Sequence, residues 1–107
     1  MLFAIKYFPR SGRTEKESRQ VRRLFVAWQP PTGVDIEAHY HYVGGGGLVV
    51  VDTQSAALLF ESLEPFKPQV SFDVEPVINV LEAIAISVDV EEWADSVLSA
   101  GSPEGTP

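Results

Sequence analysis

The sequence predicts an α+β domain of the ferredoxin-like type, with a four-stranded antiparallel sheet and two helices on one face. Three observations favour this fold class. The chain has 107 residues, which suits one domain with a modest core. Its segments alternate between the apolar periods of strands and of helices. Their order is strand, helix, strand, strand, helix and strand, as in the split βαβ arrangement, and a further helix follows.

The first strand and the first helix have clear boundaries in the sequence. Residues 2–8 are apolar and rich in strand-forming side chains, and Pro9 ends the run. Thr14 and Glu17 form a capping-box pattern, which is typical of a helix start. The Pro30-Pro31 pair ends this helix. Its buried face is predicted from four apolar residues at helical spacing: Val21, Leu24, Phe25 and Trp28.

The middle of the chain predicts a hairpin followed by a second helix. A strand is expected near residues 34–43, and the glycine run 44–47 turns it into a third strand over residues 48–51. Ser55 or Thr53 is the expected cap of the second helix. Its buried face is predicted from four residues: Ala56, Leu59, Phe60 and Leu63.

The last strand of the sheet is expected over residues 70–75, where apolar and polar side chains alternate. Residues 79–86 then fit a short helix, while residues 83–88 also fit an extra strand. Asp89 and Glu92 repeat the capping-box pattern and predict a C-terminal helix. The expected organisation is a ferredoxin-like domain, a helical extension and a disordered tail, at residues 1–88, 89–100 and 101–107.

The sheet is expected to pair with a second copy of the chain. Residues 2–8 and 48–51 are apolar on both strand faces. Strands of this kind are normally covered on both sides, whereas the two helices cover one face only. A homodimer with twofold symmetry would cover the open face. The C-terminal helix is the competing cover.

The candidate site lies on the second strand, where both histidines of the chain occur. By strict alternation, Asp35, Glu37, His39 and His41 share one face. A histidine beside a carboxylate can move a proton near neutral pH, so the expected catalytic residues are His41, His39 and Asp73, with Asp52 as the alternative carboxylate partner of His41. Glu37 with the two histidines also has the residue types of a metal site, although no metal is assigned. A solvated polar face on an edge strand is the structural alternative.

Four further side chains are expected to bind a ligand on the open sheet face. Aromatic side chains can frame a flat organic molecule, and Tyr7, Tyr40 and Tyr42 occur in the strands around the histidines. Lys6 is the only charged residue of the first strand. It is interpreted either as a cation that binds the ligand or as a side chain that reaches solvent at the strand end.

Several short motifs resemble a family of short bacterial proteins classed only as a domain of unknown function. The motifs are Trp28-x-Pro30-Pro31-x-Gly33-Val34, Tyr40-His41, Gly47 to Thr53, and Phe72-x-Val74-x-Pro76-Val77. They span about residues 1–85. The family is ferredoxin-like and similar to the dimeric α+β barrel superfamily, which implies this fold and a dimer but supplies no activity.

The resemblance also bears on individual site residues. His41 matches the family's aromatic-histidine position. The family usually has Glu where this chain has Asp52, and Arg where it has His39. The wider superfamily includes monooxygenases without cofactors, lactone isomerases, cyclases and haem proteins, so the fold does not select a reaction.

Composition and charge exclude several classes of function. The net charge of −7 argues against nucleic-acid binding. The absence of cysteine excludes disulfides and thiol catalysis. The N-terminus lacks the basic region and the long apolar core of a signal peptide, and no apolar run approaches the length of a membrane span, so a soluble cytoplasmic protein is expected. One basic cluster stands out and is read as a solvated helix face or an anion site: Arg10, Arg13, Lys16, Arg19, Arg22 and Arg23.

Two hypotheses for function follow. The first is a small-molecule enzyme or ligand-binding protein with a pocket on the open sheet face near His41, acid–base chemistry and no organic cofactor. Its ligand would be a small aromatic or carbonyl-bearing compound. The second is a non-catalytic accessory module that uses its dimer and its acidic C-terminal helix as interaction surfaces.

Overall fold

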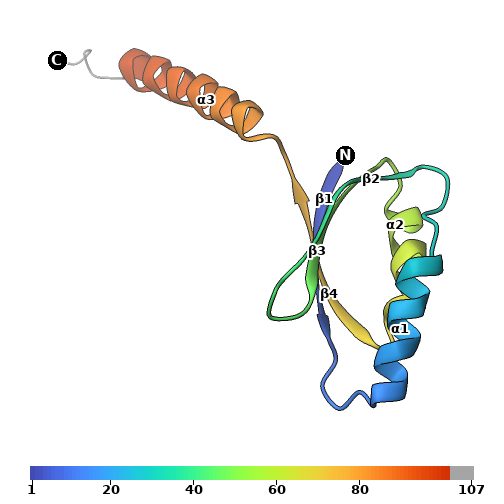
Figure 1. Cartoon of the computed structure of the whole chain (residues 1–107). Helices are drawn as coiled ribbons and strands as arrows, with labels where there is room; N and C mark the ends of the chain where they lie inside the picture. The colour runs from blue at the N-terminus through green and yellow to red at the C-terminus, as the bar shows by residue number, and fades with distance from the viewer. Residues whose placement is uncertain (102–107) are drawn as a thin grey trace. The chain divides into compact units, whose positions relative to one another are not determined.

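The structure is a computed structural model that describes residues 1–101. It consists of two units, one of residues Met1–Val77 and one that begins at Ile78. The first unit holds the sheet, and the second holds a helix. The elements in chain order (Figure 1) are β1 Leu2–Pro9, α1 Glu15–Ala27, β2 Val34–His41, β3 Gly47–Thr53, α2 Ala56–Leu63, the 3₁₀ helix η1 Glu64–Phe66, β4 Val70–Val77 and α3 Val80–Gly101.

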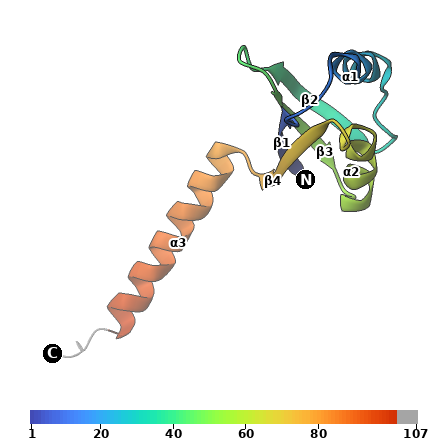
Figure 2. The same cartoon turned by 90° about the horizontal axis from the view of Figure 1, so that it is seen from below.

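The four strands form one antiparallel sheet in the order β2-β3-β1-β4. Both α1 and α2 lie on the same side of this sheet (Figures 1 and 2). The predicted fold class, an α+β ferredoxin-like arrangement with a C-terminal helix, is therefore confirmed. The central position of β1 makes its inward side chains the middle of the core.

The core lies between the sheet and the two helices and has two adjacent parts. One part contains Ile5, Val34, Val51 and Leu59. The other contains Tyr7, Val21, Phe66 and Val70. Ile5 and Tyr7 come from the same face of β1. Each large apolar side chain buried in this way contributes about 1.5–3 kcal/mol to the stability of the fold.

The helix starts follow the expected capping chemistry. At α1, the Thr14 Oγ1 accepts from the Glu17 amide at 3.1 Å and the Glu17 side chain accepts from the Thr14 amide at 3.0 Å. At α2, Ser55 is the N-cap and accepts from the Leu58 amide at 3.1 Å.

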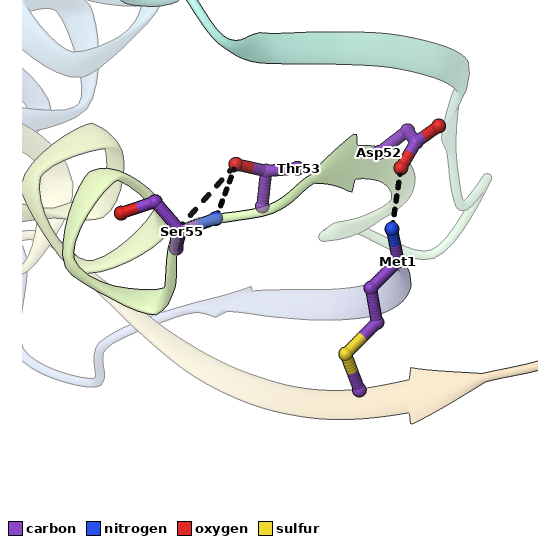
Figure 3. A network of polar contacts seen from close by, with 4 residues as sticks. All are labelled: Met1, Asp52, Thr53 and Ser55. Atoms are coloured by element: carbon purple, nitrogen blue, oxygen red, sulfur yellow. Dashed lines mark hydrogen bonds and ion pairs between the residues drawn. The ribbon is translucent and has the colours of Figure 1, made fainter.

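Thr53 supports the cap of α2 without being the cap itself. Its hydroxyl oxygen accepts a hydrogen bond from the Ser55 amide at 3.2 Å (Figure 3). The neighbouring Asp52 carboxylate binds the amino group of Met1 at 2.8 Å. The end of β3 is thus tied both to the start of α2 and to the start of β1.

The alternation expected along β2 is wrong because the strand contains a β-bulge at Glu37. Ile36 pairs with Val51, but Ala38 pairs with Val50, so Glu37 is the extra residue. A bulge shifts the phase of the side chains that follow it. His39 consequently pairs with Val49 and faces the helices, while Asp35 lies on the opposite, open face.

The second unit corrects the boundaries expected near the C-terminus. A single helix, α3, runs from Val80 to Gly101. It agrees with the helical alternative for residues 79–86 and excludes both an extra strand over residues 83–88 and a separate helix that begins at Asp89. The Asn79 side chain accepts a hydrogen bond from the Leu81 amide at 2.8 Å, which is the usual role of an N-cap. Residues 102–107, most of the expected tail, lie outside the described residues.

Helix α3 carries many exposed apolar side chains. Leu81, Trp93 and Leu98 are each at least 65 % exposed. Among residues 1–101, no helix combines the length and the apolar character that crossing a bilayer would require.

Candidate functional site

A cleft of about 660 Å³, open to solvent, lies on the helix side of the sheet. This volume falls within the range of about 300–1,000 Å³ that small-molecule sites occupy. Its apolar lining comes from α1 and from the ends of β1 and β4, mainly Pro9, Val21, Phe25, Val26 and Val70. Its polar and ionisable lining consists of Tyr7, Arg13, Arg22, His39, Tyr40 and His41.

A tyrosine–histidine pair forms the polar centre of this cleft. The hydroxyl oxygen of Tyr7 lies 2.6 Å from Nε2 of His39. Tyr7 is buried and its ring stacks on Phe25 with centroids 5.4 Å apart. His39 stays accessible to solvent. The pair also borders a smaller apolar void of about 40 Å³ between the sheet and the helices.

The pair depends on Gly47, because the side chain of Tyr7 crosses β3 there on its way from β1 to β2. Gly47 is the partner of Tyr7 in the β1–β3 register. A Cβ atom at Gly47 would overlap the hydroxyl and the ring of Tyr7, and one at Gly46 would overlap the Tyr7 carbonyl oxygen. The end of the glycine run is therefore a packing requirement as well as a hairpin turn.

Burial sets the protonation states of the pair. It raises the pKa of Tyr7 above its ordinary value. It also lowers the pKa of His39, with a second contribution from the charge of His41. Both groups are therefore neutral at neutral pH, and the tautomer of His39 decides which of the two donates in the hydrogen bond between the Tyr7 hydroxyl and Nε2. A neutral imidazole of this kind can accept a proton.

The structure brings together only part of the predicted site. His39, His41, Tyr7 and Tyr40 line the cleft. The Nδ1 atom of His41 lies 2.7 Å from the Tyr42 carbonyl oxygen, which orients the imidazole at the cleft rim. Tyr40 borders the same rim, but it lies opposite Leu48 on the open side of β2 and is 71 % exposed.

Three predicted residues lie away from the cleft. Lys6 and Asp73 are opposite one another in the β1–β4 register and occupy the open face, because their neighbours Ile5 and Tyr7 point toward the helices. Asp73 is therefore no carboxylate partner for His41. Tyr42 stacks on Phe8, with centroids 6.3 Å apart and nearly parallel rings. The expected pocket on the open face is corrected to a cleft on the helix side.

The sequence interpretation missed Arg13, Arg22 and Phe25 as cleft residues. Phe25 was assigned to the buried stripe of α1, which is correct but incomplete. The arginines belong to the basic cluster whose alternative interpretation was an anion site. Within residues 1–101, no three histidine, aspartate or glutamate side chains gather closely enough to hold a metal ion.

The fold and the cleft together define the class of this protein: a small ferredoxin-like α+β domain with a ligand-sized cleft between its sheet and its first helix. The chain belongs to the family "Domain of unknown function (DUF3303)", which matches residues 1–91. The match supports the resemblance to a domain-of-unknown-function family and extends beyond residue 85 into α3. A search of curated proteins found no match.

The depressed pKa of His39 gives the first prediction. We expect its ring to titrate below the ordinary histidine value of about 6.5 in a two-dimensional NMR titration. In the pH range between the two values, the unfolded chain binds more protons than the folded chain, so His39 makes the free energy of unfolding fall as the pH is lowered. The variant His41→Gln should raise the His39 pKa toward 6.5. A His39 pKa above 6.5 in the native protein would contradict the burial argument.

The crossing of Tyr7 over Gly47 gives the second prediction. We expect Gly47→Ala to destabilise the protein by about 1–3 kcal/mol, because the added methyl group forces the Tyr7 ring to move. In a Tyr7→Leu background, which lacks the clashing ring atoms, the same substitution should cost much less. Gly44→Ala is the matched control, since its Cβ would meet open space. Equal costs of Gly47→Ala in both backgrounds, measured by urea unfolding, would refute the crossing.

Proposed function

We propose that this protein binds a small organic molecule in the cleft between α1 and the sheet and exchanges a proton with it through His39. The observation that carries the proposal is the cleft of about 660 Å³ with the Tyr7–His39 pair at its centre. The apolar lining and the few convergent polar groups are typical of ligand sites.

The chemistry follows from the neutral state of both groups. In the tautomer with the proton on Nε2, His39 donates to the Tyr7 hydroxyl oxygen. The Tyr7 O–H can then donate a hydrogen bond to a carbonyl oxygen of the ligand, and Nδ1 of His39 can accept a proton from a neighbouring carbon or oxygen. The aromatic rings of Tyr7 and Phe25 supply a flat apolar surface. A small aromatic or carbonyl-bearing compound is the class of ligand that this combination fits.

A screen of small aromatic and carbonyl compounds by protein-observed NMR tests the proposal. We expect binders to shift the signals of Tyr7, His39 and Gly46. Val26 lines the cleft and is 87 % exposed, so Val26→Trp should fill the cleft and weaken binding without unfolding the protein. Ala57→Trp, at an exposed position of α2, is the matched control and should bind as the native chain does.

The proton transfer is tested with the bound compounds themselves. Compounds with an acidic C–H bond should lose that proton signal in deuterated water in the presence of the native protein. His39→Gln should stop the exchange while binding persists. If compounds bind instead to the open sheet face, or exchange proceeds unchanged in His39→Gln, the proposal is wrong.

We further propose that the open sheet face pairs with a second copy of the chain. The open face carries the half-buried apolar side chains of Leu2, Ala4, Leu48 and Val50. The edge of this surface also includes Phe8, which is 41 % exposed. A twofold dimer through this face would remove these side chains from water.

Sedimentation analysis tests the dimer. We expect the native chain to sediment as a dimer and Val50→Glu to shift the equilibrium toward the monomer, because the charge would be buried unpaired in the interface. Val43→Glu, at a fully exposed hairpin position, is the control and should leave the dimer intact. A native chain that stays monomeric at high concentration would exclude this arrangement.

A non-catalytic accessory role is the second candidate, and helix α3 is the observation that favours it. Its exposed apolar side chains alternate with the carboxylates of Glu82, Asp89, Glu91, Glu92 and Asp95. An exposed surface that mixes large apolar side chains with carboxylates is typical of a site where a protein partner binds. Loss of partner binding on removal of residues 78–107, with ligand binding in the cleft unchanged, would favour this role.

A further inference from the structure

We infer that the ligand of the cleft is an organic anion: a molecule with an apolar body and a carboxylate group that binds Arg13 and Arg22. This inference rests on the proposed function, since it specifies the substrate class of the same cleft. It is carried by the charge of the lining, by the arrangement of polar and apolar groups, and by the ion pairs that the described residues form.

The charge of the cleft is opposite to that of the whole chain. The protein has 15 acidic and 8 basic residues, excluding histidine, and a net charge of −7. The lining of the cleft nevertheless contains the cations Arg13 and Arg22, and it contains no aspartate or glutamate. A positive recess on an acidic protein attracts anions locally and disfavours cations.

The two arginines retain donors for a ligand. Among residues 1–101, the ion pairs are Met1 with Asp52 and Lys67 with Glu64, so neither arginine belongs to one. Arg13 is half-buried, and one of its nitrogens donates to the Gln69 carbonyl oxygen at a long 3.4 Å. The positive charge of Arg13 also lowers the pKa of Glu17 slightly, although most of that lowering comes from the hydrogen bonds of Glu17 with Thr14.

The guanidinium group selects the kind of anion. Its planar fork of N–H donors matches the two oxygens of a carboxylate. The apolar side chains of Val21, Phe25 and Val70 line the same cleft and offer a surface for the rest of the molecule. The Tyr7–His39 pair then faces a polar or reactive group of the ligand. A small carboxylic acid with an aromatic or aliphatic body satisfies all three parts of the lining.

The experiment compares matched pairs of carboxylates and their primary amides, such as benzoate with benzamide and phenylacetate with phenylacetamide, by protein-observed NMR. We expect the carboxylates to bind about tenfold more tightly than the amides at low salt, because a hydrogen bond to a charged group is the stronger one. Added salt should reduce this preference. A bound carboxylate should also raise the pKa of His39, whereas the amide should not.

Variants of the arginines locate the effect. Arg13→Gln and Arg22→Gln should each remove most of the preference for the carboxylate and leave amide binding nearly unchanged. Arg23→Gln is the matched control, because Arg23 is an exposed residue of α1 outside the lining of the cleft.

Three results would overturn the inference, and they are distinguishable. Equal binding of carboxylates and amides in the cleft would refute the anion preference while leaving the proposed small-molecule site intact. Failure of every carboxylate and amide of the series to shift the signals of the cleft would refute both. Preference for carboxylates that survives both arginine substitutions would also overturn the assignment of these residues.

Discussion

The candidate site of this protein depends on one close approach, the passage of the Tyr7 side chain over the backbone of Gly47. Tyr7 starts on the central strand, crosses its neighbour and reaches His39 on the edge strand. The contact therefore links three strands on the helix side of the sheet. It also buries the phenol and encloses part of the imidazole, and this burial keeps both groups neutral.

Most of the fold could be predicted from the sequence because its signals are local. The capping box of Thr14 and Glu17 marks the start of α1, and the apolar stripe at helical spacing marks its buried face. The glycine run marks the hairpin between β2 and β3. The start of α3 stayed ambiguous between residues 79 and 89 because β-branched residues around Ile84 and Val88 alternate as in a strand, while the cap that starts the helix is the single side chain of Asn79.

The candidate site was predicted in some of its residues but not in its position. Both histidines were identified, yet strict alternation placed them on the open face, since nothing in the local sequence distinguishes Glu37 as a bulged residue. The error also suggested Asp73 as a partner, which the register places on the other side of the sheet. Arg22 could be recognised as a cleft residue only once the packing of α1 on the sheet was known.

The bulge in β2 limits how many residues the strand can lose between Ile36 and His39. Plain alternation requires one residue between Ile36 and His39 if both are to point toward the helices, and the chain has two. Loss of either codon would leave the two side chains on their present side, whereas loss of both would send one of them to the opposite surface. Evolution can therefore shorten this segment by one amino acid, and no more, without moving the imidazole away from the tyrosine.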